Sequence, residues 1–316
     1  TILLKDRWFI YSILFGNKIL FQLFFRIFKN KLTINKNLFN KIKNIKPDIV
    51  VVPSNAFDPI GNDIVRICKI LNIKTLFLID NWDNLSSKTV FLFKPEYLGV
   101  WGEQSKSHAI QIHQYNEKDV FIVGTPRFND YIKLKDKDLS SHFNFEYILF
   151  VGCAIAFDET SALQVLDNEI YKNKHLYGKL KIVYRPHPWR QTRISEKKFL
   201  EKNFLNVILD PQVSFSYNNK TDDIQSGKGF QPNISYYPSL FKNAKLVLGP
   251  LTTMLIESII LERPTLALAY DDTVHFTSPH NSLKYFIHFD KLDMFESLHF
   301  CKNVSSLPIN FHDALS

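Results

Sequence analysis

Two polar clusters in the second half of the chain have residue types that can bind a phosphate. In the first, an apolar run ends in Gly249 and Pro250, and Thr252 and Thr253 then open a segment whose apolar residues recur at helical spacing. Small hydroxyl residues at a helix start lie beside free backbone N–H groups, which favour an anion. Glu257 is predicted on the same helix face, where its carboxylate could accept hydrogen bonds from a ribose. The alternative is an ordinary capped helix between two buried strands.

The second cluster runs from Arg185 to Arg190 and follows another apolar run. Pro186 and Pro188 restrict the backbone, so His187 is presented rigidly beside an arginine. A histidine and an arginine at one strand end suit the binding of a phosphate or diphosphate leaving group. The alternative is a surface turn that the prolines stiffen.

A third cluster, in the first half, follows the apolar run 74–79. Its carboxylates could serve as the base or the nucleophile of a group transfer, with Asp83 as first candidate and Asp80 and Glu103 behind it. Turn formation and helix capping are the alternative for such aspartates. The candidates for contacts to the substrate are Asn84, Ser86, Lys88 and Arg127.

The cysteine and histidine pattern predicts no metal site. Cys68, Cys153 and Cys301 are widely spaced, which also favours a reducing compartment. His108 and His113 are expected on the surface of a helix. The sequence therefore predicts chemistry that uses neither a metal nor another cofactor.

The clusters follow short apolar runs that alternate with helical patterns. This alternation predicts an α/β fold with parallel sheets, in which ligands bind at the carboxyl ends of the strands. The polar segment 128–146 predicts a crossing between an N-terminal domain, 1–135, whose start is expected to be incomplete, and a C-terminal domain, 145–316. The predicted strands are 47–53, 74–79, 97–101, 119–123, 147–151, 180–184, 206–209, 246–249 and 265–269.

The charge balance indicates an anionic partner. The formal net charge is +8 and the pI about 9.1, yet no basic segment interleaved with aromatics resembles a nucleic-acid module, so nucleic acid is not an expected partner. Residues 8–28 form an aromatic, basic, amphipathic pattern broken by Lys18 and Arg26. Packing of this helix on a sheet is the preferred interpretation, and contact with an anionic membrane surface is the alternative.

An Arg-Pro-His-Pro strand end, followed by a small-hydroxyl turn and a helical glutamate, resembles the donor half of GT-B glycosyltransferases over roughly residues 147–270. Bacterial sialyl- and Kdo-transferases and CDP-glycerol glycerophosphotransferases are the most similar. The resemblance implies two Rossmann-like domains facing a cleft. His187 and Pro188 match the first motif; Thr252 and Thr253 match the second, with Thr where Ser is more usual. The resemblance implies that these residues hold a cytidine phosphate, and that Glu257 holds the ribose.

This resemblance implies a metal-independent glycosyltransferase. It would move a CMP-activated Kdo or other nonulosonic acid onto a growing bacterial surface glycan, such as capsule, O-antigen or lipopolysaccharide. The expected acceptor is a glycan or a lipid-linked glycan, and the expected location is the cytoplasm, with peripheral inner-membrane contact as a further option. The alternatives are a CDP-glycerol-type glycerophosphotransferase, a UDP-GlcNAc 2-epimerase-like enzyme and an inactive nucleotide-sugar-binding module.

Overall fold

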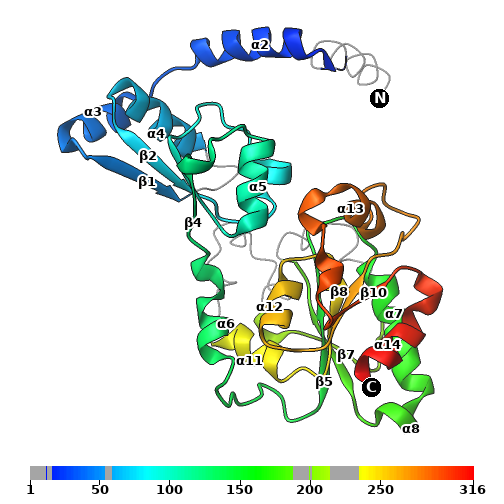
Figure 1. The fold of residues 1–316 in the computed structure, drawn as a ribbon. Coiled ribbons are helices and arrows are strands. Elements are labelled where there is room, and N and C mark those ends of the chain that lie inside the picture. The colour runs from blue at the N-terminus through cyan, green and yellow to red at the C-terminus, as the bar shows by residue number, and fades with distance from the viewer. Residues whose placement is uncertain (1–11, 13–15, 54–58, 188–198, 200, 214–234) are drawn as a thin grey trace. The chain divides into compact units, whose positions relative to one another are not determined.

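The chain folds as two parallel α/β units. The computed structural model describes residues 12, 16–53, 59–187, 199, 201–213 and 235–316. The chain divides into unit 1, Thr1–Thr125, and unit 2, Pro126–Ser316 (Figure 1). Every strand pairing in both sheets is parallel. The predicted α/β class with two Rossmann-like domains is therefore confirmed.

Unit 1 contains a four-stranded sheet in the order β1-β2-β3-β4. Its core forms where Val52, Phe77 and Val100 of the sheet pack with Val65 and Ala109 of two helices. The strands are β1 (Ile49–Pro53), β2 (Lys74–Leu78), β3 (Tyr97–Val100) and β4 (Val120–Ile122). The helices are α2 (Lys18–Lys31), α3 (Lys36–Ile45), α4 (Pro59–Ile70) and α5 (Glu103–Gln111), with a π-helical turn at Asn84–Lys88.

Unit 2 contains a six-stranded sheet in the order β10-β9-β8-β5-β6-β7. The strands are β5 (Tyr147–Val151), β6 (Lys181–Arg185), β7 (Val207–Leu209), β8 (Val247–Pro250), β9 (Thr265–Leu268) and β10 (Leu298–Cys301). The helices are α6 (Asn129–Leu134), α7 (Glu159–Lys172), α8 (Lys174–Tyr177), α11 (Tyr236–Lys242), α12 (Met254–Ile260), α13 (Pro279–Tyr285) and α14 (Leu307–Leu315).

Helices cover both faces of the sheet in unit 2. Ile148 and Phe150 of β5 pack with Leu163 of α7 and Phe311 of α14 in one apolar cluster. Helices α6, α11 and α12 contact one another, and α12 contacts β8 and β9. Figure 1 shows α7 and α14 on one face of this sheet and α11 and α12 on the other. Both faces of β5 are covered, which explains why all its side chains are apolar and buried.

Three features differ from the sequence predictions or were not predicted. The segment 128–146 was expected to cross between domains, but α6 lies within it and packs on α11 and α12 in unit 2. The boundary consequently falls after Thr125, before the predicted end at 135. Strand β10 and helix α14 were not predicted, because a four-residue strand with a histidine at its second position gives no clear alternation.

Helix α2 also differs from the preferred interpretation of the pattern over residues 8–28, of which 8–11 and 13–15 lie outside the described residues. Asn17 caps it by accepting hydrogen bonds from the backbone N–H groups of Ile19 and Leu20. Instead of burying an apolar face on a sheet, most of its apolar side chains are exposed. None of the helices in the described residues combines the length and the apolar character needed to cross a bilayer.

Candidate functional site

The strand order of unit 2 indicates where a ligand binds at the carboxyl ends of its strands. The chain runs outward from β5 through β6 to β7, and then returns so that β8 pairs with the opposite side of β5. Beyond β8 it runs outward again through β9 to β10. This is the strand order of dinucleotide-binding Rossmann domains, which bind ligands where the order reverses. The reversal lies between β5 and β8, so the loops after these strands form the candidate site.

Gly152 is the first residue of the loop after β5, and its position has no room for a side chain. A Cβ there would lie 2.8 Å from the backbone nitrogen of His187 and 2.8 Å from Oε2 of Glu159. The Gly152 N–H also donates to the Arg185 carbonyl at 2.8 Å. The ends of β5 and β6 are thereby pinned together, and the predicted residue His187 lies directly beside this loop. Pro188, predicted with it, lies outside the described residues.

Glu159 lies just after the same loop and was not identified as a site residue from the sequence. It is the first residue of α7 and is buried. Its carboxylate accepts hydrogen bonds from the Cys153 N–H at 3.0 Å and from the Tyr184 hydroxyl at 2.6 Å. These bonds fix the loop against β6. A glycine after a strand, with an acidic pair at the next helix start, is the sequence signal that could have identified it.

The Arg185 guanidinium is engaged inside the protein, which differs from the expected contact with a donor phosphate. Its Nε and Nη2 donate to the Tyr237 hydroxyl at 3.0 and 2.7 Å, and Nη1 donates to the Pro186 carbonyl at 2.6 Å. Nε also lies 3.5 Å from Oδ2 of Asp210. Burial raises the pKa of Asp210, against the opposing effects of the Tyr236 hydroxyl and Arg185. Arg185 therefore compensates a buried carboxylate.

Gly249 was also expected at the nucleotide, but the structure gives it a packing role. It is buried within β8, and a Cβ there would lie 2.1 Å from the Val151 carbonyl oxygen. Thr252 and Thr253 follow β8 in the candidate site, as predicted, and are partly exposed. Thr253 occupies the N-cap position of α12 without a capping hydrogen bond from its side chain.

Two residues from separate predicted groups meet in unit 2. Arg127, predicted to bind substrate, donates from Nε and Nη2 to Oε1 of Glu257 at 3.0 and 2.8 Å. Tyr131 of α6 donates to Oε2 of the same carboxylate at 2.8 Å. Burial, followed by the charge of Glu257, raises the pKa of Tyr131. The Glu257 side chain is only 4% exposed, whereas that of Arg127 is 44% exposed.

The predicted cluster of unit 1 follows β2 and folds as the π-helical turn. Asp83 pairs through Oδ2 with Lys88 Nζ at 2.6 Å, and its backbone carbonyl accepts from the Ser86 hydroxyl at 3.1 Å. Asn84 donates from Nδ2 to Oδ1 of Asp80. Among the described residues, Oδ1 of Asp83 is buried with no hydrogen-bond partner. Partial desolvation of its carboxyl raises the pKa of Asp80, although the residue as a whole is exposed.

The remaining candidates of unit 1 lie around α5. Glu103 is exposed in the first turn of this helix, where a negative charge interacts favourably with the helix dipole. His108 is buried, contrary to the surface position expected from the sequence. His113 is partly buried, and its Nε2 donates to the Leu85 carbonyl at 2.7 Å.

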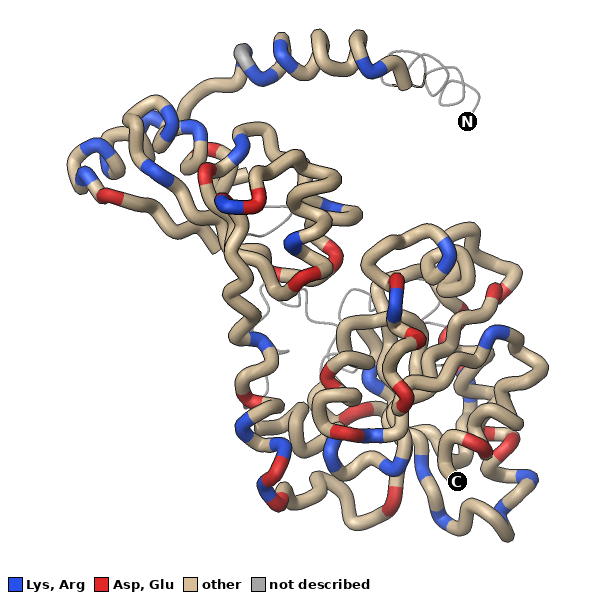
Figure 2. The backbone as a smooth tube through the Cα atoms, viewed as in Figure 1, with Lys and Arg blue, Asp and Glu red and all other residues tan. Residues whose placement is uncertain are grey.

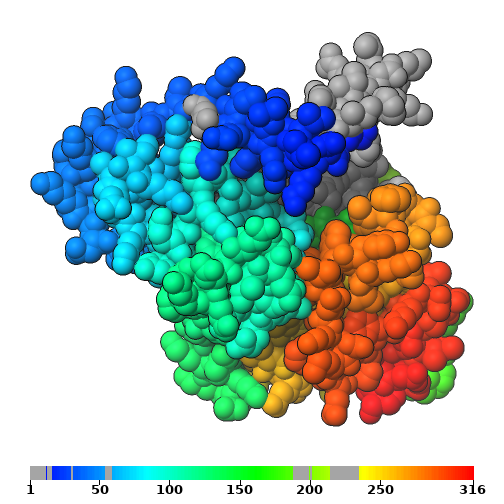
Figure 3. Space-filling view, turned by 45° about the horizontal axis from the view of Figure 1, so that its top comes forward, coloured from blue at the N-terminus to red at the C-terminus, as the bar shows by residue number. Residues whose placement is uncertain are grey.

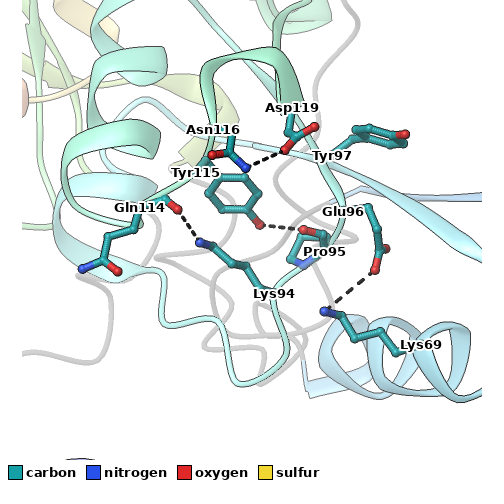
Figure 4. A pocket seen from close by; sticks show the side chains of 9 residues that line it. All are labelled: Lys69, Lys94, Pro95, Glu96, Tyr97, Gln114, Tyr115, Asn116 and Asp119. Carbon is teal, nitrogen blue, oxygen red and sulfur yellow. Dashed lines mark hydrogen bonds and ion pairs between the residues drawn. The ribbon is translucent and has the colours of Figure 1, made fainter.

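Unit 1 contains a cavity of about 320 Å³ (Figure 4). It lies at the end of the strands opposite to the π-helical turn. It is formed around the segments that precede β3 and β4, at the amino ends of the strands. Its polar groups pair with one another: Lys94 donates to the Gln114 carbonyl at 2.7 Å, and the Tyr115 hydroxyl donates to the Pro95 carbonyl at 3.0 Å. Because ligands of parallel sheets bind at the carboxyl ends, this cavity is not the candidate site.

Metal ligands are not grouped in the part of the chain that the structure describes. No cluster of three or more His, Cys, Asp or Glu side chains with the arrangement of a metal site occurs among these residues. Cys68, Cys153 and Cys301 are buried free thiols. We therefore assign no residue to a metal.

A scan of the sequence against protein-family models finds no match, and a search of curated proteins finds none either. Among solved structures, the chain is similar to the UDP-GlcNAc 2-epimerase of Methanocaldococcus jannaschii, with a TM-score of 0.54 and 15% identity over 89% of this chain and 73% of that chain. The same enzyme in complex with UDP-GlcNAc and UDP gives a TM-score of 0.52 and 15% identity, over 89% and 72% of the two chains. At this identity the likeness shows the fold alone, which is that of the GT-B class.

Proposed function

We propose that the chain is a nucleotide-sugar enzyme of the GT-B fold that transfers the sugar to an acceptor, with the nucleotide bound by unit 2. The observation that carries this proposal is the strand reversal between β5 and β8, because the predicted phosphate-binding residues flank it. His187 lies beside the β5 loop at Gly152, and Thr252 and Thr253 follow β8. A rigid histidine and two hydroxyls at this edge suit the phosphate of an activated sugar.

Arg127 supplies the positive charge in this proposal. Thr253 and Glu257 are four residues apart around α12 and so lie on the same side of it. Glu257 holds the Arg127 guanidinium through two hydrogen bonds from the arginine, while much of the arginine stays exposed to a ligand. Three of the roughly four acceptor positions of the carboxylate are used by Arg127 and Tyr131. We therefore assign Glu257 to positioning Arg127 first, and to the ribose only through its remaining acceptor capacity.

The acceptor chemistry is assigned to unit 1. An inverting transfer needs a base for the acceptor hydroxyl, and a double displacement needs a nucleophilic carboxylate. Asp83 is the first candidate for either role because it follows β2 at the carboxyl end of the sheet and its carboxylate is held beside the Lys88 ammonium. Asp80 is the second candidate, since its raised pKa brings it closer to the working range of a base.

The finer proposal is a CMP-activated acidic sugar as donor, and it rests on the resemblance of His187 and the Thr252–Thr253 turn to the cytidine motifs. A second candidate, a UDP-GlcNAc 2-epimerase-like activity, is favoured by the fold comparison with the Methanocaldococcus jannaschii enzyme. The two candidates differ in the base of the nucleotide. They also differ in the need for an acceptor.

Nucleotide binding tests the proposal. Saturation-transfer NMR and thermal shift would be measured with CMP, CDP, UDP, GDP and ADP on the wild type, His187→Ala and the double variant Thr252→Val/Thr253→Val. Thr33→Val, at an exposed threonine of unit 1, is the matched control. We expect CMP to bind the wild type and the control, and both site variants to lose about tenfold or more in affinity.

The other outcomes are equally informative. Preference for CDP would favour a glycerophosphotransferase, and preference for UDP would favour the epimerase candidate. If no nucleotide binds, or if the site variants bind as the wild type does, the assignment of the donor site to unit 2 is wrong.

A further inference from the structure

We propose that α2 is an interfacial helix that binds the surface of an anionic phospholipid bilayer. The inference is independent of the nucleotide chemistry proposed above. Seven apolar side chains of this 14-residue helix are between 40% and 75% exposed. They are Ile19, Leu20, Phe21, Leu23, Phe24, Ile27 and Phe28. A globular protein rarely leaves so many large apolar side chains of one helix in water unless they contact something else.

The apolar side chains cover one broad side of the helix. At 100° per residue, Leu23, Ile27, Leu20, Phe24 and Phe28 follow one another around the axis, and Phe21 and Phe25 continue the same arc; the final residue of the helix, Lys31, is the one charge that falls within it. The arc extends roughly 200° around the axis, which is wider than the stripe of a helix packed on one neighbour. Helices with an arc of this kind lie in the plane of a bilayer surface, with aromatic and aliphatic groups at the boundary between headgroups and acyl chains.

The opposite side of α2 is cationic. Lys18, Gln22, Arg26 and Lys29 recur at spacings of four, four and three residues, which makes one stripe along the helix. No acidic residue occurs between residues 16 and 47, while Lys31, the α3 lysines and Lys46 add further positive charge. Figure 2 shows Lys and Arg positions and no Asp or Glu position along α2. Lys18 and Arg26, which are exposed, would lie level with lipid phosphates while the apolar arc enters the boundary region.

The C-terminal end of α2 is attached to the body of unit 1. Lys29 Nζ lies 4.6 Å from the centre of the Phe93 ring. Just after the helix, the Leu32 carbonyl accepts from Arg66 Nη1 at 2.7 Å. The preceding turns are exposed, and Figure 3 shows the dark-blue atoms of this part of the chain on the surface of the molecule. A helix held at one end presents its length to a surface without disturbing the fold.

The charge pattern favours a bilayer over a second copy of the chain. Two α2 helices packed through their apolar arcs would leave their cationic stripes on the outer sides, without an acid on either helix to compensate them. An anionic leaflet compensates every cation at once. A neutral bilayer would offer the apolar contact without this compensation, so binding should require acidic lipid.

Vesicle flotation of the full chain tests this inference. The vesicles would be phosphatidylcholine alone or phosphatidylcholine with about 30% phosphatidylglycerol, a content high enough to give a negative surface potential. Ile27→Glu places a charge in the apolar arc at an exposed position. Gln22→Glu makes the same change of charge in the polar stripe and is the matched control.

We expect the wild type to bind the acidic vesicles about tenfold or more better than the neutral ones, and to lose most of this binding between about 0.1 M and about 0.5 M salt. Ile27→Glu should lower binding about tenfold or more, and Gln22→Glu no more than about threefold. Both variants should unfold at the wild-type temperature, because both positions are exposed.

Three results would overturn the proposal. The first is equal binding to neutral and acidic vesicles, or no binding to either. The second is a wild-type dimer that Ile27→Glu converts to a monomer, because the arc would then be an interface between copies. The third is a lower unfolding temperature of Ile27→Glu, because the arc would then be covered by the protein's own core in solution.

Discussion

Arg127 and Glu257 are 130 residues apart in the sequence, yet two nitrogens of the arginine converge on a single carboxylate oxygen, at 3.0 and 2.8 Å. The carboxylate is almost completely buried and the guanidinium is not. The contact joins the start of unit 2 to α12, whose N-cap is one of the proposed phosphate-binding threonines. The same ion pair therefore contributes to stability and to the geometry of the proposed site.

Loss of this arginine should destabilise unit 2. Arg127→Leu removes two of the three hydrogen bonds that Arg127 and Tyr131 donate to the buried Glu257 carboxylate, and leaves the bond from the Tyr131 hydroxyl. We expect a loss of about 1–3 kcal/mol in the free energy of unfolding. Lys135→Ala removes an ion pair with Glu262 that is exposed to solvent, and it should cost much less, because water screens the two charges. Urea denaturation of both variants measures the difference. Equal losses would show that burial of Glu257 carries no special cost.

Gly249 should tolerate no side chain. In Gly249→Ala the new Cβ meets the backbone oxygen of Val151, and a backbone atom of a central strand cannot move without disturbing its neighbours. We expect a loss of about 3 kcal/mol or more in unfolding free energy, or a failure to fold. Gly102→Ala is the control, because nothing lies within 4 Å of its Cβ position. Thermal unfolding compares them, and a stable Gly249→Ala protein would contradict the packing role.

Much of the fold follows from local pattern. Strand β5 matches its predicted range because both its faces are buried, which makes it continuously apolar. Helix α7 also begins at a local signal, because Asp158 caps it by accepting from the Ser161 N–H. By contrast, β10 is short and polar on one side, and α6 lies in a segment whose charges resemble a linker. Their positions are decided by long-range packing, which a single sequence does not display.

The site was only partly predictable for the same reason. The loops at the carboxyl ends of the strands follow from the order of apolar runs, so His187, Thr252 and Thr253 were placed at the predicted edge. The partners of a charged side chain do not follow from spacing. Arg185 resembled a phosphate ligand, and only the fold reveals the buried Asp210 beside it.

The role of Asp83 makes a prediction for catalysis. If Asp83 is the base or the nucleophile, Asp83→Asn should lower kcat for sugar transfer by about 10²–10⁴-fold and leave nucleotide binding unchanged. The measurement is release of free nucleotide from the nucleotide sugar in the presence of acceptor. Ser87→Ala is the control, because this exposed serine hydroxyl donates only to the Asp83 backbone carbonyl. An unaltered kcat in Asp83→Asn would reduce Asp83 to a turn residue.

The environment of His113 predicts a pH dependence of stability for unit 1. Burial, together with the charge of Lys94, lowers the pKa of His113, against the opposing effect of its bond to the Leu85 carbonyl. In the unfolded chain the pKa of this histidine is about 6.5, so the unfolded state binds the proton at a higher pH than the folded state does. Stability from this group is thus complete above about pH 6.5 and is lost as the pH falls through the folded pKa.

The variant His113→Gln isolates this effect, since glutamine keeps an N–H donor for Leu85 and does not titrate. Between about pH 7.5 and about pH 5.5 the wild type should lose more unfolding free energy than the variant, because only the wild type carries the histidine whose folded pKa is lowered. Urea denaturation at the two pH values measures this difference, because the substitution leaves the rest of the chain unchanged. Parallel losses would mean that the folded ring accepts its proton as readily as the unfolded one.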